Sequence, residues 1–326
     1  MKAVVIDDTV TDRPLVYREV PEPPFGDMDL LIAVRAAGVN RADLRRAAGH
    51  FAASEKRPLS IAGLELAGEV IAVGKSVSNF ASGDRVMAMA GSAYAEQAVV
   101  DARLAIPVPR SFDWHQAAAT PISFITAYDA LTAAADFKKN ESVLVQGASS
   151  GAGIATVQVA RWLGAREIFG TAGSRDKLDR LVKLGCTVPI DYKTDNIVSV
   201  ILQKTDMEGV DVVIDVVGAH MAQVNIDAAA TGGRIVCLGR VAGSQSTVNL
   251  DEFSRKRLRM IGVTFRTRSL EERIAVIETF RNKVLPALDD GSLRPVVDSV
   301  LPLTEAARAQ EYMRDNRHFG KIVLIT

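Results

Sequence analysis

The segment 142–155 constrains the fold of this chain more than any other. It reads Ser142-Val-Leu-Val-Gln-Gly147-Ala-Ser-Ser-Gly151-Ala-Gly153-Ile-Ala, an apolar strand that runs into glycines and then directly into a helix. Glycines let the backbone turn tightly and approach a diphosphate, which the free amides and positive end of the helix attract. The segment therefore predicts a dinucleotide-binding turn, with a tight packing turn as the alternative.

The rest of the middle of the chain repeats this strand–helix pattern. Short apolar runs at 142–146, 167–171, 210–217, 234–238 and 259–265 predict strands, and helical spacing appears between them, as at 154–163 and 177–184. Alternation of buried strands and amphipathic helices is typical of a doubly wound parallel sheet. We therefore expect an α/β domain of the Rossmann type over 123–265.

The two ends of the chain have a different pattern. Short strand-like runs at 30–36, 67–73 and 84–89 alternate with turn residues before position 110. After Phe265 we expect a helix over 270–288, a short strand near Val296 and a final strand over 321–325. These observations predict that the sheet domain is inserted into a discontinuous β-rich domain, formed by 1–122 and 266–326.

The end of the second strand indicates which nucleotide the turn would hold. A site for NAD carries Asp or Glu there, to bind the ribose 2′-hydroxyl. This chain has Gly173-Ser174-Arg175, followed by Lys177, a hydroxyl and cations that suit a 2′-phosphate. The sequence therefore favours NADPH, with Ser174 as a simple helix cap as the alternative.

The same glycine turn also matches a hydrolase motif. Gly147-Ala-Ser149-Ser-Gly151 has the GxSxG form of a nucleophile elbow. A hydrolase would need a downstream acid and histidine, and the downstream histidines are His220 and His318. Nothing in the sequence around either suggests a triad, so acyl hydrolysis is the weaker hypothesis.

Composition narrows the partners and the compartment. Lys plus Arg and Asp plus Glu both number 39 in 326 residues, so no net positive charge attracts nucleic acid. The 2 cysteines are too few for a disulfide framework or a four-thiolate zinc site. Asp7 and Asp8 interrupt the N-terminal apolar run, and no 18-residue stretch is free of charges and breakers. We expect a cytoplasmic protein with no membrane span and no nucleic-acid partner.

Several short motifs taken together resemble a known family. They are Gly38-Val-Asn40-Arg-Ala-Asp43-Leu, Gly63-Leu64-Glu65-Leu-Ala-Gly68, Gly83-Asp84-Arg85-Val86, Tyr94-Ala-Glu96 and Thr171-Ala-Gly-Ser174. With the glycine turn they resemble the medium-chain dehydrogenase/reductase superfamily, in particular its zinc-independent quinone oxidoreductase branch and the p53-inducible quinone oxidoreductase-like group. The resemblance spans nearly the whole chain, and it implies that the β-rich domain is GroES-like.

The resemblance also bears on metal and substrate. Relatives with a catalytic zinc carry Cys at the position of Asn40 and His at that of Leu64, and neither residue here replaces those ligands. Without a Lewis acid, hydride transfer favours acceptors that delocalise the incoming charge themselves. The resemblance therefore implies an NADPH:quinone oxidoreductase acting on quinones or similar conjugated carbonyls. The alternatives are an enoyl or 2-alkenal double-bond reductase on the same scaffold and a non-catalytic NADPH-binding protein.

The resemblance further implies a set of site residues. Asn40 and Thr126 would lie beside the nicotinamide and the substrate, and Phe51 stands where many members have Tyr, which makes the pocket more apolar. The implied cofactor-binding residues are Gly151, Gly153, Ile154, Ser174, Lys177, Tyr192, Gly218, Gly239, Phe265 and Lys321. Family members commonly dimerise through the last strand of the sheet, so we expect a homodimer that pairs residues 259–265.

Overall fold

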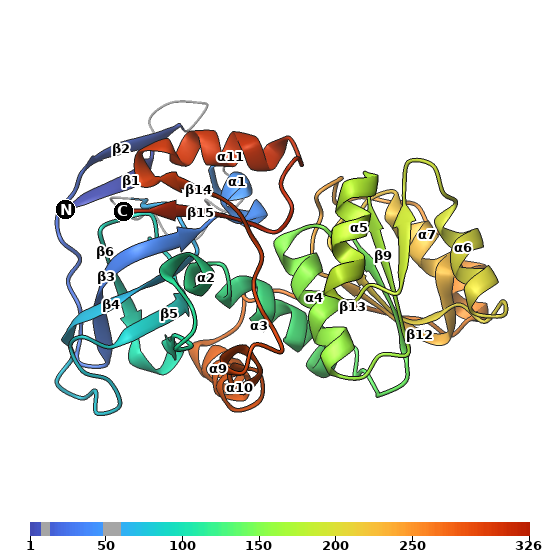
Figure 1. Ribbon diagram of the computed structural model, residues 1–326, viewed down its shortest axis with the longest axis horizontal. Helices are drawn as coiled ribbons and strands as arrows, with labels where there is room; N and C mark the ends of the chain where they lie inside the picture. Colours follow the sequence, from blue (N-terminus) through green and yellow to red (C-terminus); the bar gives the residue numbers. More distant parts are fainter. Residues whose placement is uncertain (8–13, 48–59) are drawn as a thin grey trace. The chain divides into compact units, whose positions relative to one another are not determined.

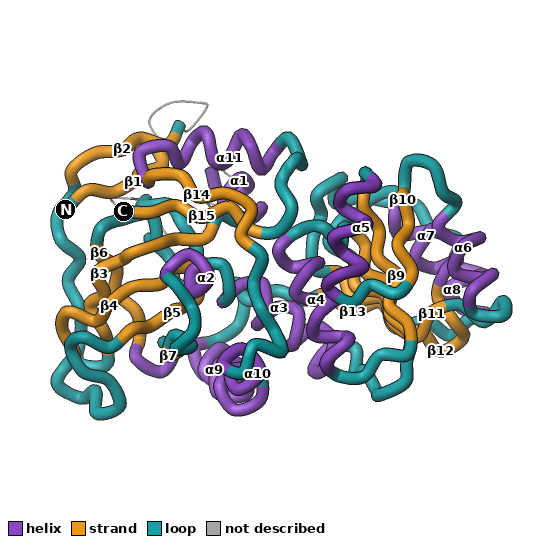
Figure 2. Tube along the Cα trace, in the orientation of Figure 1, coloured by secondary structure: helices purple, strands orange, loops and turns teal. Residues whose placement is uncertain are grey.

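The computed structural model describes residues 1–7, 14–47 and 60–326, with the backbone alone for 45–47. The chain divides into two compact units, 1–122 with 273–326, and 123–272. Helices and strands of both units carry the labels of Figures 1 and 2.

Unit 123–272, all of which is described, is built on a parallel sheet in the order β10-β9-β8-β11-β12-β13. The strands are β8 (Ser142–Gln146), β9 (Glu167–Ala172), β10 (Val188–Asp191), β11 (Val210–Asp215), β12 (Ala229–Cys237) and β13 (Arg259–Gly262). This order reverses direction beside β8, so the crossing helices fall on opposite faces of the sheet. The expectation of a doubly wound Rossmann sheet is confirmed.

Two groups of helices cover this sheet (Figure 1). The helices are α3 (Pro121–Asp129), continued by the π-turn Ala130–Ala134, then α4 (Gly151–Trp162), α5 (Arg175–Leu184), α6 (Ile197–Lys204), α7 (Met221–Ala228) and α8 (Leu250–Arg255). Helices α4 and α5 pack on each other and on β8, β9 and β10, whereas α7 packs on α6, α8, β11 and β12. Buried side chains such as Leu144, Phe169 and Ile226 fill the core of this unit.

The other unit has a mixed sheet in the order β14-β15-β3-β4-β5-β7, with β6 also paired to β3, and a separate hairpin of β1 and β2. The strands are β1 (Lys2–Ile6), β2 (Leu15–Glu19), β3 (Asp29–Gly38), β4 (Glu65–Val73), β5 (Arg85–Met89), β6 (Gln97–Asp101), β7 (Ile106–Pro107), β14 (Val297–Pro302) and β15 (Lys321–Ile325). Strand β15 pairs with β3, so the two ends of the chain share one sheet (Figure 2).

Short helices complete this unit. They are α1 (Arg41–Ala47), α2 (Trp114–Ala118), α9 (Leu270–Lys283), α10 (Leu285–Asp289) and α11 (Ala306–Arg314), with 3-10 turns at Ala102–Leu104 and Leu303–Glu305. The division between the units at 272/273 falls within α9. The domain boundaries expected from the sequence, including 265/266, stay a prediction.

Three sequence predictions need correction, and one strand was not predicted. The strand expected over 210–217 ends at Asp215, whose carboxylate binds the amides of Val217 and Gly218. The strand expected over 259–265 ends at Gly262. The helix expected over 270–288 is interrupted at Val284, because Pro286 lacks the amide that would continue it. The sequence analysis also missed β10, which is short and contains Pro189.

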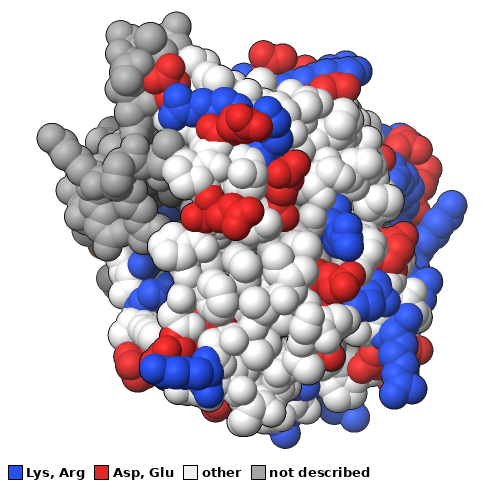
Figure 3. Space-filling model, turned by 90° about the vertical axis from the view of Figure 1, so that its left-hand side faces the viewer, with Lys and Arg blue, Asp and Glu red and all other residues white. Residues whose placement is uncertain are grey.

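Among the described residues, no helix is long and apolar enough to cross a membrane. On the face of the molecule in Figure 3, acidic and basic side chains are interspersed rather than gathered into a field of one sign. This distribution agrees with the balanced charge of the sequence.

Candidate functional site

The glycine turn after β8 is a close backbone-to-backbone contact. Gly147 has a φ of +67°, in the left-handed region that favours glycine. A Cβ atom on Gly153 would lie 2.4 Å from the carbonyl oxygen of Gly147. The first turn of α4 can therefore approach the end of β8 this closely only with glycine at position 153, and the positive φ favours glycine at position 147.

Two amides at the start of α4 donate to the N-cap residue, and the two before them are available to a ligand. Ser150 is the N-cap: its Oγ accepts from the Gly153 amide at 3.1 Å and its carbonyl from the Ile154 amide at 2.8 Å. The amides of Gly151 and Ala152 remain for an anion, at the positive end of the helix. Of the three predicted diphosphate residues, Gly151 thus offers an amide, and Ala152 is a residue the sequence reasoning missed.

The predicted 2′-phosphate residues come together at the ends of β9 and β10. Ser174 caps α5, its Oγ 3.5 Å from the Lys177 amide nitrogen. A Cβ atom on Gly173 would lie 2.5 Å from the Tyr192 hydroxyl oxygen, so the Tyr192 ring lies directly against this turn. Tyr192 is 51% exposed, an uncommon exposure for an aromatic side chain and one that leaves its ring available to a ligand.

Gly218 and Gly239 meet at the ends of β11 and β12. Gly218 has a φ of +74° and forms a bridge with Gly243. A Cβ atom on Gly239 would lie 2.2 Å from the carbonyl oxygen of Val216. The two glycines therefore let the loops after β11 and β12 touch. The carboxyl ends of parallel strands all lie at one end of the sheet. These loops therefore lie at the same end of the sheet as the glycine turn.

Phe265 and the helix that carries Thr126 are linked by an ion pair. The Arg268 guanidinium stacks on the Phe265 ring at 4.4 Å and binds both carboxylate oxygens of Asp129, at 3.2 and 2.7 Å. Asp129 ends α3, the helix of Thr126. The sequence reasoning missed Arg268 and Asp129 because a bidentate pair 139 residues apart leaves no local pattern.

In the other unit, Asn40 is held by a buried ion pair. Lys321 Nζ lies 2.5 Å from Glu65 Oε1, 2.7 Å from Asn40 Oδ1 and 3.0 Å from the Val39 carbonyl oxygen. Asn40 Nδ2 donates to Glu65 Oε1 at 2.9 Å and to the Gly38 carbonyl at 3.2 Å. Lys321 is 4% exposed and Glu65 is fully buried, so every N–H of the ammonium is used inside this unit.

This arrangement determines what Asn40 can do. Its two N–H groups are already donated within the chain, and one lone pair of its Oδ1 accepts from Lys321. A carboxamide oxygen has two lone pairs, so Asn40 can accept one further hydrogen bond and cannot donate one to a substrate carbonyl.

Asp43 contacts Asn40 in the same buried cluster. Its Oδ2 accepts from the Asn40 amide at 2.8 Å and from the Tyr94 hydroxyl at 3.0 Å. Burial raises the pKa of Asp43 to about 7, despite the lowering effect of these hydrogen bonds and of Lys321. Burial and the Asp43 charge raise the pKa of Tyr94 well above its usual value. Phe51, the remaining predicted residue, lies outside the described residues.

Comparison with known proteins agrees with the geometry of both units. Residues 26–110 match the alcohol dehydrogenase GroES-like domain, and residues 151–282 match the zinc-binding dehydrogenase family. Prostaglandin reductase-3 of Bos taurus is 34% identical over 94% of this chain and 84% of its own length. Quinone oxidoreductase of Rattus norvegicus is 31% identical over 94% and 91%.

A solved structure extends these comparisons to the fold. Escherichia coli quinone oxidoreductase complexed with NADPH superposes with a TM-score of 0.90, at 25% identity, over 100% of both chains. A parallel sheet with a glycine turn, joined to a GroES-like sheet, defines an NAD(P)-dependent oxidoreductase. The chain belongs to the medium-chain dehydrogenase/reductase superfamily, as the sequence motifs predicted.

The family description includes zinc, but the residues here do not fit a zinc ion. Asn40 and Leu64 offer a carboxamide and a hydrocarbon where zinc needs thiolate, imidazole or carboxylate. The Asn40 oxygen already binds the Lys321 ammonium, a positive charge that opposes a second cation. In the part of the chain that the structure describes, no group of three or more His, Cys, Asp or Glu side chains could hold a metal.

Proposed function

We propose that this protein is an NADPH-dependent, zinc-independent reductase that transfers hydride to quinones or similar conjugated carbonyls. The observation that carries the proposal is the edge formed by the ends of β8, β9 and β10. There, helix amides outside the cap follow a glycine turn, Ser174 caps the helix that carries Lys177, and the Tyr192 ring lies against Gly173. The solved relative complexed with NADPH and the two curated reductases support it.

The residues of the chain take distinct roles in this proposal. The amides of Gly151 and Ala152 bind the diphosphate, and Ser174, Lys177 and Tyr192 hold the adenosine 2′-phosphate, while bound NADPH supplies the hydride. Gly218 and Gly239 leave room for the ribose and nicotinamide, and Phe265 packs at the far end.

Asn40 and Lys321 act together at the reactive end. Since Asn40 can accept but not donate, we assign it to a nicotinamide amide N–H rather than to the substrate oxygen. Thr126 is then the hydroxyl that remains to bind the substrate carbonyl. A site with one neutral donor suits quinones, because the hydroquinone anion is stabilised by delocalisation and is protonated by water.

A steady-state assay tests this function directly. We expect NADPH oxidation with naphthoquinones and benzoquinones, and slower oxidation with simple ketones, which need stronger polarisation. Absence of NADPH oxidation across quinones, enones and 2-alkenals, with NADPH still raising the melting temperature, would contradict the enzyme and support a non-catalytic NADPH-binding protein.

Ser174→Asp tests the nucleotide preference without loss of the helix cap. Asp caps a helix as well as Ser does, but its carboxylate repels a 2′-phosphate and binds a ribose 2′-hydroxyl. We expect kcat/KM for NADPH to fall at least about tenfold, equivalent to about 1.4 kcal/mol, and that for NADH to rise. Ser174→Asn is the matched control, because it caps the helix with no charge. Equal effects of Ser174→Asp and Ser174→Asn would contradict the assignment of Ser174 to the adenosine 2′-phosphate.

A second candidate is reduction of a conjugated carbon–carbon double bond in an enone or 2-alkenal. The prostaglandin reductase among the relatives favours it. Turnover of a naphthoquinone and of a 2-alkenal under matched conditions separates the two. We also propose that the protein is a homodimer that pairs its β13 strands.

A further inference from the structure

A continuous chain of buried hydrogen bonds runs along the carboxyl ends of β9, β8 and β11. The Gly147 amide donates to Thr171 Oγ1 at 2.9 Å, and the Thr171 hydroxyl donates to Gln146 Oε1 at 2.9 Å. Gln146 Nε2 donates to Asn225 Oδ1 at 3.0 Å, and Asn225 Nδ2 donates to Asp215 Oδ2 at 2.9 Å. The chain begins at the glycine turn and ends on a carboxylate.

Asp215, at the end of this series of hydrogen bonds, holds a second loop. Asp215 Oδ1 accepts from the amides of Val217 and Gly218, at 2.7 and 3.0 Å. These residues form the loop after β11, for which we propose a place beside the ribose and nicotinamide. One side-chain path therefore joins the turn proposed for the diphosphate to the loop proposed for the nicotinamide and its ribose.

Burial makes these bonds obligatory. Asn225 is fully buried, Gln146 and Thr171 are 1% exposed and Asp215 is 2% exposed. An unpaired polar group at such a position costs free energy, whereas an apolar replacement of the whole set would pack without that risk. On β8 the residues between Ser142 and Gln146 are all apolar, and Gln146 is the last residue of the strand. The polar set thus occurs where ligands bind in open α/β sheets.

The donors and acceptors of this series of hydrogen bonds all run in one direction. Every donor faces toward Asp215, so its negative charge fixes the orientation of the amides of Asn225 and Gln146 and of the Thr171 hydroxyl. Burial raises the pKa of Asp215, and the amides of Gly218 and Val217 and the Asn225 side chain oppose that rise. The three N–H groups that the carboxylate accepts all favour its charged form.

We propose that Thr171, Gln146, Asn225 and Asp215 are positioning residues that fix the glycine turn and the 217–218 loop relative to each other, so that the diphosphate and the nicotinamide end of NADPH bind in one register. This inference rests on the proposed function for its ligand. Its physical basis, the directed chain of bonds, can be tested in the protein without any cofactor.

Exchanging the charge along the chain is the decisive experiment. In Asp215→Asn, the new amide must keep its oxygen on Val217 and Gly218, so its NH2 group faces the NH2 group of Asn225. Rotation of Asn225 and then of Gln146 only moves the mismatch along, until the Thr171 hydroxyl proton has no acceptor. In the double variant Asp215→Asn/Asn225→Asp, the carboxylate at position 225 accepts from Gln146 and from the amide at 215. Every bond is then restored.

The expected results separate positioning from stability. Asp215→Asn should weaken NADPH binding about tenfold or more in a fluorescence titration, and the double variant should recover to within about threefold of the wild type. Adenosine 2′-monophosphate, which reaches only the Ser174 end, should bind all variants equally. Thr171→Val, which keeps the β-branched shape in the strand, should weaken NADPH binding in the same way.

Hydrogen exchange of the Gly147 amide supplies a readout that needs no cofactor. It should accelerate in Asp215→Asn, although Gly147 does not contact Asp215, and return to the wild-type rate in the double variant. The inference is overturned if the folded single variants bind NADPH normally, or if the charge exchange rescues neither NADPH binding nor Gly147 protection. A wild-type protein that does not bind NADPH would contradict the proposed function instead, and the exchange rates would still test the chain.

Discussion

Lys321 and Glu65 are charged residues whose importance shows only at the scale of single atoms. In the sequence they lie 256 residues apart, on β15 and β4. In the fold the ammonium binds the carboxylate, the Asn40 amide and a backbone carbonyl, and Glu65 Oε2 also accepts from the Ile122 amide at 2.8 Å. The pair therefore orients Asn40 and joins β4 to the first turn of α3.

Removal of one partner of this pair should destabilise the protein strongly. Lys321→Met leaves the Glu65 carboxylate buried without its cation, a change that typically costs about 3–5 kcal/mol of unfolding free energy. Glu65→Gln/Lys321→Met, which leaves no buried charge, should recover a large part of the loss. Urea unfolding of the two variants measures both values. Equal stability of the single and double variants would contradict this account.

Asp43 makes stability depend on pH in an unusual direction. Burial raises the pKa of its carboxyl from an ordinary value of 3.8 to about 7, so the folded protein holds this proton more tightly than the unfolded chain. Stability from this group is therefore greatest below about pH 4 and is lost as pH rises to about 7, by up to roughly 4 kcal/mol.

Asp43→Asn isolates this contribution. The amide oxygen still accepts from Asn40 and Tyr94, but the group no longer titrates. We expect the unfolding free energy of the wild type, relative to the variant, to decrease between pH 5 and pH 8. Urea unfolding across that range measures the difference, and parallel curves would show that Asp43 is ionised or exposed throughout.

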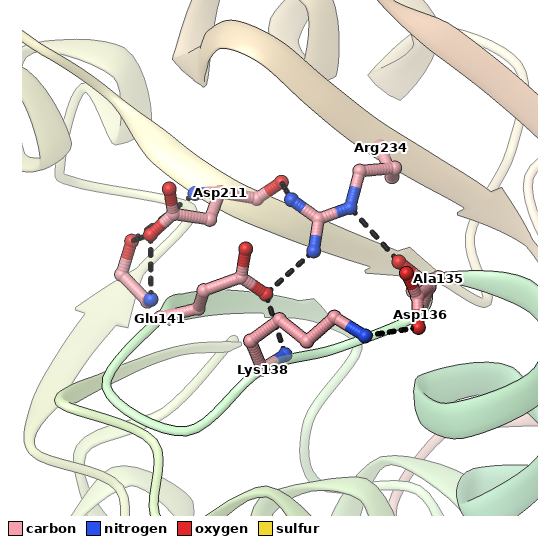
Figure 4. Close-up of polar contacts among 7 residues, drawn as sticks. Ala135, Asp136, Lys138, Glu141, Asp211 and Arg234 are labelled. Atoms are coloured by element: carbon pink, nitrogen blue, oxygen red, sulfur yellow. Dashed lines mark hydrogen bonds and ion pairs between the residues drawn. The ribbon is translucent and has the colours of Figure 1, made fainter.

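At the scale of the elements, a second polar cluster connects strands of the parallel sheet at their amino ends. The Arg234 guanidinium, on β12, donates to the Ala135 carbonyl at 2.9 Å, the Asp211 carbonyl at 3.1 Å and Glu141 Oε2 at 2.5 Å (Figure 4). The Asp211 carboxylate accepts from Ser142, the first residue of β8. The amino ends of β8, β11 and β12 thus share one cluster.

Arg234→Met should therefore lower stability without changing the cofactor site. We expect a loss of about 3 kcal/mol, because the substitution leaves the carbonyls of Ala135 and Asp211 without this donor and leaves Glu141 with the Lys138 amide but without its cation. NADPH affinity should stay within twofold, since the cluster lies at the amino ends of the strands. Arg166→Met, at an exposed position of the same unit, is the control and should change stability by less than about 0.5 kcal/mol. A large loss of NADPH affinity would contradict the separation of the two edges.

The elements also show where sequence periodicity succeeds. Strands β8, β9 and β11 were predicted because their residues are apolar on both faces, as buried parallel strands require. Strand β10 was missed because four residues with a proline give no period, and it is defined by its pairing with β9. The end of β11 was misplaced because the apolar run continues through Val216 and Val217, whereas the Asp215 carboxylate ends the strand by local hydrogen bonds to the amides of Val217 and Gly218.

At the scale of the whole molecule, β13 is the last strand of its sheet, and its outer side pairs with no strand that the structure describes. The Val263 amide faces β12, so by alternation the Ile261 amide faces β12 and the Met260 amide faces outward. Met260 is 45% exposed. Pairing with a second copy would satisfy these groups and cover the edge, which is the basis of the proposed homodimer.

Met260→Pro tests the homodimer. Proline removes the outward amide while leaving the ladder to β12 intact, and edge strands tolerate it. We expect sedimentation to show a dimer for the wild type and a monomer for Met260→Pro. Met260→Ala keeps the amide and should remain dimeric. A wild-type monomer, or a dimeric proline variant, would place the interface elsewhere or remove it.

The sequence by itself determined the class of the fold and the family, because glycine turns, buried apolar strands and helix caps are local and leave a local pattern. The residue types of Ser174 and Lys177 favoured a 2′-phosphate and the family resemblance added Tyr192, and these roles stay a prediction; the structure shows the Tyr192 ring against Gly173, beside the Ser174 cap. Only the tertiary structure decided that Asn40 accepts rather than donates and that Lys321 forms an ion pair with Glu65. It also decided that hydrogen bonds through three other side chains connect Asp215 to Gly147. Hydrogen-bond partners far apart in the chain are chosen by packing, and no period or motif encodes that choice.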